Sequence, residues 1–351
     1  MVREPRPGAA TRPRGHVVTA FDKFRSSAAQ SELNGVVARV AAARGLTSDA
    51  IGVSDGGEGF SSAFFGDVLT AHTLGPLGEP LCAPITFTDS AEGPIAVIAT
   101  SDVVGRDLLT EPSGEEALAA TSAGVGLLIR HAIGLGARRV IVGCGGSATS
   151  DAGRGCYDVL QSAGGLGVPV TVATDVTTTF LGARRYARQK GVRDEDLGLI
   201  DARLTAARQL YRDEHGVDVE TLARSGAAGG IAGALAALGA TLVGGFDEVA
   251  RAQGLDERLA RASLVVTGEG RLDAGSLEGK VVLGVAAHTP TSVPLLVVCG
   301  SVDDDGVQSL VSRYPNARVV SLAQRWAQRS LTDTLACVDE IVAETLDALD
   351  L

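Results

Sequence analysis

The sequence is poor in the residues that bind nucleic acids and membrane surfaces. Aromatic residues make up 4% of the 351 residues, and the chain holds only three lysines among its 31 basic residues. The formal net charge is −11, and no basic run interrupts the acidic chain. Nucleic acids and anionic lipid surfaces attract clustered positive charge, so this composition argues against both partners.

Membrane-spanning runs and metal-binding cysteine motifs are also missing from the sequence. No apolar run approaches the ~20 residues that a transmembrane helix needs. Residues 1–15 are rich in Pro, Gly and Arg without an apolar stretch, so we expect a disordered tail and no secretory signal. The five cysteines are scattered and lack C-x-x-C spacing, which indicates neither a zinc site nor a disulfide framework. Reduced cysteines are typical of a cytoplasmic protein.

Apolar runs alternate along the chain in the manner of an α/β protein. Residues 17–20 predict a strand, 27–44 a helix and 51–53 a second strand, which together indicate a parallel sheet. Between residues 67 and 101 the strands are closely spaced and separated by Gly and Pro, which predicts antiparallel pairing. The alternation of strands and helices returns from residue 264 to 349. We therefore expect two domains, with a crossing near residue 66.

The stretch GCGGSATSDAGRG, at residues 143–155, stands out in the middle of the chain. A predicted helix (115–136) and a short β-branched strand (138–142) precede it, and a helical pattern begins near Arg154. Glycines at a strand-to-helix turn leave backbone N–H groups free, and the positive end of the helix dipole adds to them. This pattern predicts an anion cradle, although a tight structural turn of the same composition is equally compatible with it.

Acidic residues follow several of the predicted strands. They are Asp22, Asp55 with Glu58, Asp151, Asp175, and Glu269 with Asp273. Any one of these acids fits ordinary turn chemistry, but the carboxyl ends of parallel strands form a common ligand-binding edge. Acids, an anion cradle and the nearby cations Arg25, Lys190, Arg271 and Lys280 are the groups that phosphoryl transfer uses.

Common nucleotide and hydrolase motifs do not explain these turns. Residues 275–280 read GSLEGK, which has three residues between its glycines where a P-loop has four. No G-x-G-x-x-G opens a helix after a strand, which disfavours a nicotinamide cofactor. Neither G-x-S-x-G nor H-E-x-x-H occurs in the chain.

Seven sequence blocks, taken together, resemble the type I glycerate kinase family. They are DKFRSS (22–27), SDGGEGF (54–60), GGSATSDAG (145–153), TDVTTTFLG (174–182), ARQKG (187–191), GAAGG (226–230) and TGEGRLDAGSLEGK (267–280). Their order is collinear with the family over about residues 16 to 302. The last two blocks match the family pattern at every fixed position.

The resemblance implies an α/β kinase with a Rossmann- or flavodoxin-like parallel-sheet domain into which a second α/β domain is inserted. Residues 16–65 and 263–351 would form the first domain, and residues 66–262 the inserted one. The enzyme would use ATP and Mg²⁺ to phosphorylate a hydroxyl of D-glycerate or a related hydroxy acid. Its partner would be this small molecule, and the enzyme would be a monomer or a homodimer.

The matching blocks also imply site residues. The candidate catalytic residues are Asp22, Asp55, Asp151 and Lys280. The candidate substrate-binding residues are Arg25, Ser26, Ser27, Glu58, Arg271 and Asp273. For the nucleotide they are Gly145, Gly146, Ser147, Thr149, Lys190, Gly229 and Gly230, and for the metal Asp175 and Glu269.

Departures from the family pattern keep other interpretations open. Arg25 stands where the family has lysine, Phe60 where it has threonine, and Ala152 where it has glycine. The family's glutamate near Thr100 is missing. One alternative is a family member with an acceptor other than glycerate, and the alternative from another functional class is a catalytically silent paralogue that binds a metabolite.

Overall fold

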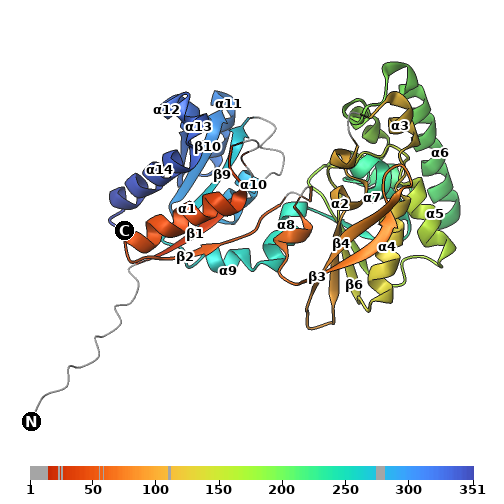
Figure 1. Cartoon of the computed structure of the whole chain (residues 1–351), viewed down its shortest axis with the longest axis horizontal. Helices are drawn as coiled ribbons and strands as arrows, with labels where there is room; N and C mark the ends of the chain where they lie inside the picture. Colours follow the sequence, from red (N-terminus) through yellow and green to blue (C-terminus); the bar gives the residue numbers. More distant parts are fainter. Residues whose placement is uncertain are drawn as a thin grey trace, which may run out of the picture. The chain divides into compact units, whose positions relative to one another are not determined.

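The computed structural model describes residues 15–351 except 23, 25, 26, 55, 58, 110, 111 and 274–280. The described chain folds into two compact units (Figure 1). The first contains the described residues up to Ile51 and those from Gly254 to the C-terminus, and the second contains Gly52–Gln253. The fold is therefore an α/β domain whose chain is interrupted by a second α/β domain.

The crossings between the units lie N-terminal to the positions expected from the sequence, which were 65/66 and 262/263. In the structure the chain crosses after Ile51 and again after Gln253. The first shift has a physical cause, because Phe60, Ala63 and Phe64 pack against strands of the second unit. The apolar side chains after the glycine-rich block thus belong to the core of the inserted unit.

The first unit is built on a five-stranded parallel sheet. Its strands are β1 (His16–Phe21), β2 (Thr47–Ala50), β9 (Leu264–Leu272), β10 (Leu295–Val302) and β11 (Ala317–Ser321), in the order β11-β10-β9-β1-β2. Counted within this unit, the order is 2-1-3-4-5, the flavodoxin-like arrangement. Its topological switch point lies between β1 and β9, which pair with Phe21 opposite Gly268. The strand expected at residues 51–53 lies instead at residues 47–50, on the sheet edge.

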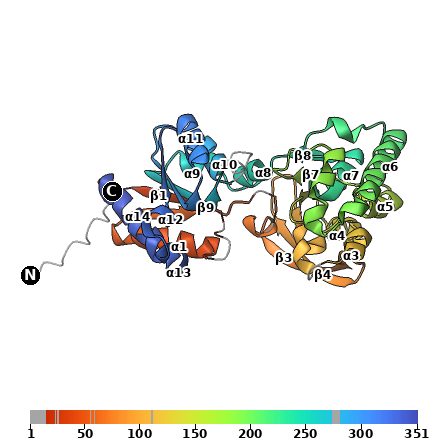
Figure 2. The same cartoon turned by 90° about the horizontal axis from the view of Figure 1, so that it is seen from above.

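Helices cover both faces of this sheet (Figure 2). They are α1 (Gln30–Ala43), α9 (Leu255–Leu259), α10 (Val281–His288), α11 (Asp304–Arg313), α12 (Leu322–Trp326), α13 (Arg329–Thr332) and α14 (Thr334–Ala348). The buried residues of α1, among them Leu33, Val36, Val37 and Val40, recur with the period of a helix. They share one core with α14 and with one face of the strands.

The second unit contains a six-stranded mixed sheet. Its strands are β3 (Asp67–Leu74), β4 (Pro80–Thr88), β5 (Ile95–Ala99), β6 (Arg139–Gly143), β7 (Val170–Ala173) and β8 (Thr241–Val243), paired in chain order. The β3–β4 and β4–β5 pairs are antiparallel, which confirms the prediction for this stretch, and the remaining pairs are parallel. The carboxyl ends of β5 to β8 therefore share one edge.

The helices of the second unit are short, apart from α4 and α6. They are α2 (Ser101–Val104), α3 (Gly114–Ala119), α4 (Ala123–Gly134), α5 (Arg154–Ser162), α6 (Leu197–His215), α7 (Ile231–Ala237) and α8 (Gly245–Ala252). 3₁₀ turns are formed by Ser61–Ala63, Arg106–Leu108, Leu181–Tyr186, Arg188–Lys190, Asp194–Asp196, Val219–Thr221 and Ala227–Gly230. The prediction of a single helix at residues 115–136 is wrong, because the structure has two helices there, α3 and α4. The chain breaks at Ser122, whose backbone N–H and hydroxyl both donate to Asp151.

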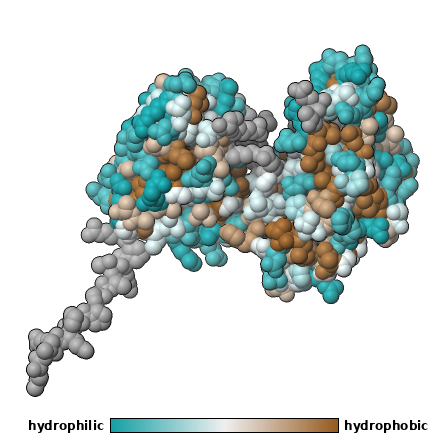
Figure 3. All heavy atoms as spheres, viewed as in Figure 1, coloured by the Kyte–Doolittle hydropathy of each residue, from teal (hydrophilic) through white to brown (hydrophobic). Residues whose placement is uncertain are grey.

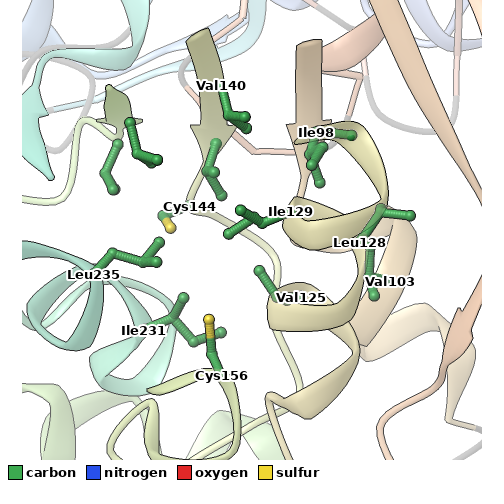
Figure 4. Packing of buried hydrophobic residues seen from close by; sticks show 14 of the residues in the cluster. Ile98, Val103, Val125, Leu128, Ile129, Val140, Cys144, Cys156, Ile231 and Leu235 are labelled. Carbon is green, nitrogen blue, oxygen red and sulfur yellow. The ribbon is translucent and has the colours of Figure 1, made fainter. Parts of the chain in front are cut away.

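Side chains of β5 alternate between the two cores of this unit, as the two-residue period of a strand requires. Ile98 packs with α4 and α7 on one face, whereas Val97 packs with Phe60 on the other. Figure 4 shows Ile129 and Leu235 on the first face, beside Cys144 at the end of β6. Burial raises the pKa of the Cys144 thiol to about 12, so this cysteine acts as an apolar core residue.

None of the described helices combines the length and the apolar character that crossing a membrane would need. Among the described residues, Phe65 is the most exposed of the large apolar side chains, and Val68 and Leu69 of the edge strand β3 are also exposed. Figure 3 shows hydrophobic atoms on the visible face of the second unit.

Candidate active site

The turn that follows β6 is fixed by hydrogen bonds to Thr100 and to residues in and after α2. Thr100, at the end of β5, donates its hydroxyl to the Gly145 carbonyl at 2.9 Å and accepts the Gly145 N–H at 3.2 Å. The carbonyl of Gly146 accepts the N–H of Arg106, and the N–H of Ala148 donates to Val104. Residues 144–148 thus form an extended turn anchored to α2.

Two of the glycine-rich blocks meet at this turn. A Cβ atom added to Gly145 would lie 2.6 Å from the Cα of Gly57, and one added to Gly143 would lie 2.4 Å from the ring of Phe60. A Cβ on Gly56, which has a φ of +90°, would lie 2.7 Å from the carbonyl of Ala173. A side chain at any of these positions would push the two backbone segments apart, so glycine is required for their close approach.

Lys190 is the buried cation of the turn. Its Nζ donates to the Ser147 hydroxyl at 3.0 Å and to the Thr149 carbonyl at 2.7 Å, and the residue is 5% exposed. Burial lowers the pKa of this ammonium to about 8, and the nearby charge of Asp151 opposes the shift. A lysine that is desolvated in this way interacts strongly with an anion that reaches it.

The same turn presents donors that the described part of the chain leaves unused. The backbone N–H groups of Ser147, Thr149 and Ser150 have no acceptor among the described residues. All three residues are at least nine-tenths buried. Buried N–H groups are almost always paired, so this turn fits an oxyanion bound at these donors.

Asp151 has a structural task in this geometry. Its carboxylate accepts four hydrogen bonds, from the N–H and the hydroxyl of Ser122 and from the N–H groups of Gly153 and Gly155. These bonds provide an acceptor for two N–H groups at the start of α5. They also connect the segment between α3 and α4 to the turn after β6. We therefore describe Asp151 as a residue that positions the turn, and its predicted catalytic role stays a prediction.

The GAAGG block closes the turn from the other side. Ala228, Gly229 and Gly230 all have left-handed backbone angles, with φ values of +51°, +69° and +101°. A Cβ on Gly229 would lie 2.0 Å from the Thr149 carbonyl and 3.1 Å from the Lys190 ammonium. Glycine at position 229 thus lets the backbone approach the lysine and the turn at once.

Asp175, at the end of β7, caps a helix in the structure. Its two carboxylate oxygens accept the N–H groups of Gly245 at 2.8 Å and Phe246 at 3.1 Å, where α8 begins. Among the described residues, no group of three or more His, Cys, Asp or Glu side chains could hold a metal ion. Ligation of a metal ion by Asp175 and Glu269 therefore stays a prediction.

The candidate residues of the first unit gather at the switch point of its sheet. The N–H of Asp22 donates to the Gly268 carbonyl at 2.9 Å, so Asp22 follows β1 beside Glu269 of β9. Glu269 lies within the strand and not in the turn that the sequence suggested, since β9 runs to Leu272. Arg271 and Asp273 form an ion pair of 3.7 Å at the carboxyl end of β9.

The contacts described above do not include the remaining candidate residues. Ser27 is exposed, and its hydroxyl donates to the Phe24 carbonyl at 3.5 Å. Arg25, Ser26, Asp55, Glu58 and Lys280 lie outside the described residues. The structure thus joins Gly145, Gly146, Ser147, Thr149, Lys190, Gly229 and Gly230 in the second unit, and Asp22, Glu269, Arg271 and Asp273 in the first.

The family model described as "Glycerate kinase family" matches residues 17–164 and 161–348 of this chain. The chain belongs to this family. It is therefore a kinase, an enzyme that transfers a phosphoryl group to a hydroxyl group. In this glycerate kinase family member, the turn after β6 and the buried Lys190 are the described groups that suit a phosphate.

Curated relatives cover most of the chain. It is 32% identical to the glycerate 2-kinase of Escherichia coli, over 82% of this chain and 86% of that protein. It is 30% identical to the glycerate kinase of Bacillus subtilis, over 86% and 91%. The crystal structure of a glycerate kinase 2 from Salmonella typhimurium, described in its title as putative, has the same fold, with a TM-score of 0.75, 25% identity and coverage of 96% and 98%.

Arg224 is a polar residue of this edge that sequence reasoning missed. It lies two positions before the GAAGG block, has a φ of +76° and donates Nη1 to the Thr174 carbonyl. A positive φ cannot be predicted from the sequence when the residue is not glycine. The one available signal was an arginine two positions before a glycine-rich block.

Proposed function

We propose that the protein is an ATP-dependent kinase that phosphorylates a hydroxyl of D-glycerate or of a closely related hydroxy acid. The observation that carries the proposal is the turn of residues 143–155, which contacts a buried ammonium and contains three N–H groups without an acceptor among the described residues. Relatives named glycerate kinase support the acceptor class. The family shows kinase chemistry, and the nucleotide and the acceptor are the parts that we propose.

Phosphates of the nucleotide would bind at this turn. Phosphoryl transfer depends on donors and cations that are fixed before the reaction, because charge on the phosphoryl oxygens must be stabilised as the bond to the leaving group breaks. The N–H groups of Ser147, Thr149 and Ser150 provide fixed dipoles, and Lys190 provides the charge. Mg²⁺ would accompany the nucleotide, whose phosphates usually supply part of the ion's ligands. No step is assigned here to a metal held by the protein.

The acceptor hydroxyl needs a carboxylate that accepts its proton. Asp22 and Asp55 are the candidates for this role, and Asp22 is placed at the switch point of a flavodoxin-like sheet, where ligands of such folds bind. The substrate-binding roles of Arg271 and Asp273 are compatible with the same edge. A cytoplasmic location and a monomeric or dimeric state are further parts of this proposal.

A substrate screen tests the proposal. The purified chain is incubated with ATP, with and without Mg²⁺, and with a panel of hydroxy acids of which D-glycerate is one. ADP release is followed by a coupled assay, and the phosphorylated product is identified by mass. We expect ADP only with acceptor and Mg²⁺ present. Ligand-dependent stabilisation without ADP release from any acceptor would identify a silent metabolite-binding paralogue and contradict the proposal.

A further inference from the structure

Arg224 adopts a backbone conformation that is costly for its side chain. Its φ of +76° lies in the left-handed region, which glycine occupies without strain and other residues rarely adopt. Four other described residues apart from glycine share a positive φ: Ala152, Ala228, Ala327 and Asp350. Arg224 alone among them carries a long cationic side chain. Strain of this kind persists where the local structure fixes it, and it clusters at ligand sites.

The surroundings fix both ends of this residue. The Arg224 N–H donates to the Thr177 carbonyl at 3.2 Å, and its own carbonyl accepts the N–H of Ala227 at 3.0 Å. Its guanidinium donates Nη1 to the Thr174 carbonyl at 2.8 Å. These three contacts hold the half-buried side chain across the carboxyl end of β7.

The guanidinium keeps most of its donors available. A guanidinium has five N–H donors, and this one makes a single hydrogen bond and no ion pair among the described residues. Many arginines of the second unit are neutralised, for example Arg188 by Asp194 and Arg208 by Asp218. Arg224 is thus a fixed, uncompensated cation whose remaining donors can form a fork for an oxyanion.

Its position is close to the turn of residues 143–155. The N–H of Cys144 donates to the Ala173 carbonyl at 2.9 Å, so the end of β6 lies one strand spacing, ~4.8 Å, from the end of β7. Gly56 packs on Ala173 and Thr174, and Gly57 packs on Gly145. Arg224 and the turn therefore border one edge of the sheet within the second unit.

We propose that Arg224 binds the carboxylate of the acceptor acid. The inference rests on the proposed function, and it adds a specificity residue to it. Lys190 is already fixed in the phosphate turn, whereas the planar fork of Arg224 matches a planar carboxylate in bidentate geometry. Arg224 lies outside the seven sequence blocks, so the resemblance to the family does not indicate this cation.

The test uses Arg224→Gly and Arg224→Gln in the full chain. Loss of a charged bidentate contact raises the KM for D-glycerate about tenfold to a hundredfold, with the KM for ATP changed less than about threefold. Because glycine suits a φ of +76°, Arg224→Gly melts at the wild-type temperature or above it. Arg203→Gln is the matched control, since Arg203 also donates one Nη1, at 2.8 Å, to a backbone carbonyl, that of Leu118.

Two results would overturn the inference. One is an unchanged KM for D-glycerate in both Arg224 variants, and the other is an increase confined to the KM for ATP. A wild-type enzyme without activity on any hydroxy acid would contradict the proposed function instead. In that case thermal stabilisation by D-glycerate decides: stabilisation of the wild type that Arg224→Gly loses supports the inference, and an equal or absent shift in both proteins rejects it.

Discussion

The ammonium nitrogen of Lys190 lies 2.7 Å from the carbonyl oxygen of Thr149, although 41 residues separate the two in the chain. This contact places a cation beneath the turn that follows β6. The N–H groups of Ser147, Thr149 and Ser150 in this turn have no acceptor among the described residues, and we propose that they and the cation bind an anion together. The following predictions depend on this relationship and on the residues that hold it.

Replacing Lys190 should separate activity from stability. Lys190→Met removes the charge and keeps the length, and we expect kcat/KM for ATP to fall about a hundredfold or more. The unfolding free energy should stay the same or rise, because a buried charge is lost. Arg188→Met is the control, since Arg188 lies on the same 3₁₀ turn with an exposed side chain. A Lys190→Met enzyme within fivefold of the wild type would show that the turn does not need this cation.

The pKa of Lys190 predicts the pH dependence. Burial lowers this pKa to about 8, so the charge is lost as the pH rises through 8, and kcat/KM for ATP should decline there. In the unfolded chain the pKa is about 10.4, so between pH 8 and 10.4 the unfolded state binds more protons. The contribution of Lys190 to the unfolding free energy therefore rises with pH in this window. Parallel pH–rate and chemical denaturation series check both signs as differences between the wild type and Lys190→Met, because buried thiols with raised pKa values, such as that of Cys144, also make the stability depend on pH.

Asp151 should matter for stability as well as for activity. Asp151→Ala leaves Ser122 and the amides at the start of α5 without their acceptor, and we expect a loss of about 3 kcal/mol. The control is Asp158→Ala on α5, whose exposed pair with Arg154 contributes at most about 1 kcal/mol. Urea denaturation measures both variants. Equal stability of the two proteins would argue against the structural role of Asp151.

A methyl group at position 229 should disrupt the turn. In Gly229→Ala the new Cβ would lie 2.0 Å from the Thr149 carbonyl, so the backbone must move, at a cost above about 3 kcal/mol. Gly239→Ala is the control, because Gly239 also has a positive φ but no atom within 4 Å of the added Cβ. It should cost only about 1–2 kcal/mol, the price of the backbone conformation. Thermal denaturation compares the two, and similar losses would contradict a close approach at Gly229.

Much of the fold could be predicted from patterns of apolar residues. The alternation of strands and helices gave the parallel sheets, and the Gly- and Pro-separated runs after residue 67 gave the antiparallel strands. The break in the expected helix at residues 115–136 could not be predicted in this way. It depends on a hydrogen bond between Ser122 and Asp151, which are 29 residues apart.

The site residues were harder to interpret than the fold. The sequence predicts a catalytic role for Asp151 and a metal-binding role for Asp175, and in the structure both carboxylates accept backbone N–H groups at helix starts. A sequence cannot distinguish these uses, because turns, caps and ligand sites all favour Asp. Lys190 could be identified only through the family block, since nothing in its local sequence marks a buried lysine.

The most direct test of the account compares D-glycerate-dependent ADP formation by the wild type and Lys190→Met, with the product identified by mass. The account predicts that the wild type forms ADP and singly phosphorylated glycerate in equal amounts, and that Lys190→Met, although folded, forms both about a hundredfold more slowly or less. A wild type that forms no phosphorylated glycerate, or a Lys190→Met enzyme as active as the wild type, would contradict it.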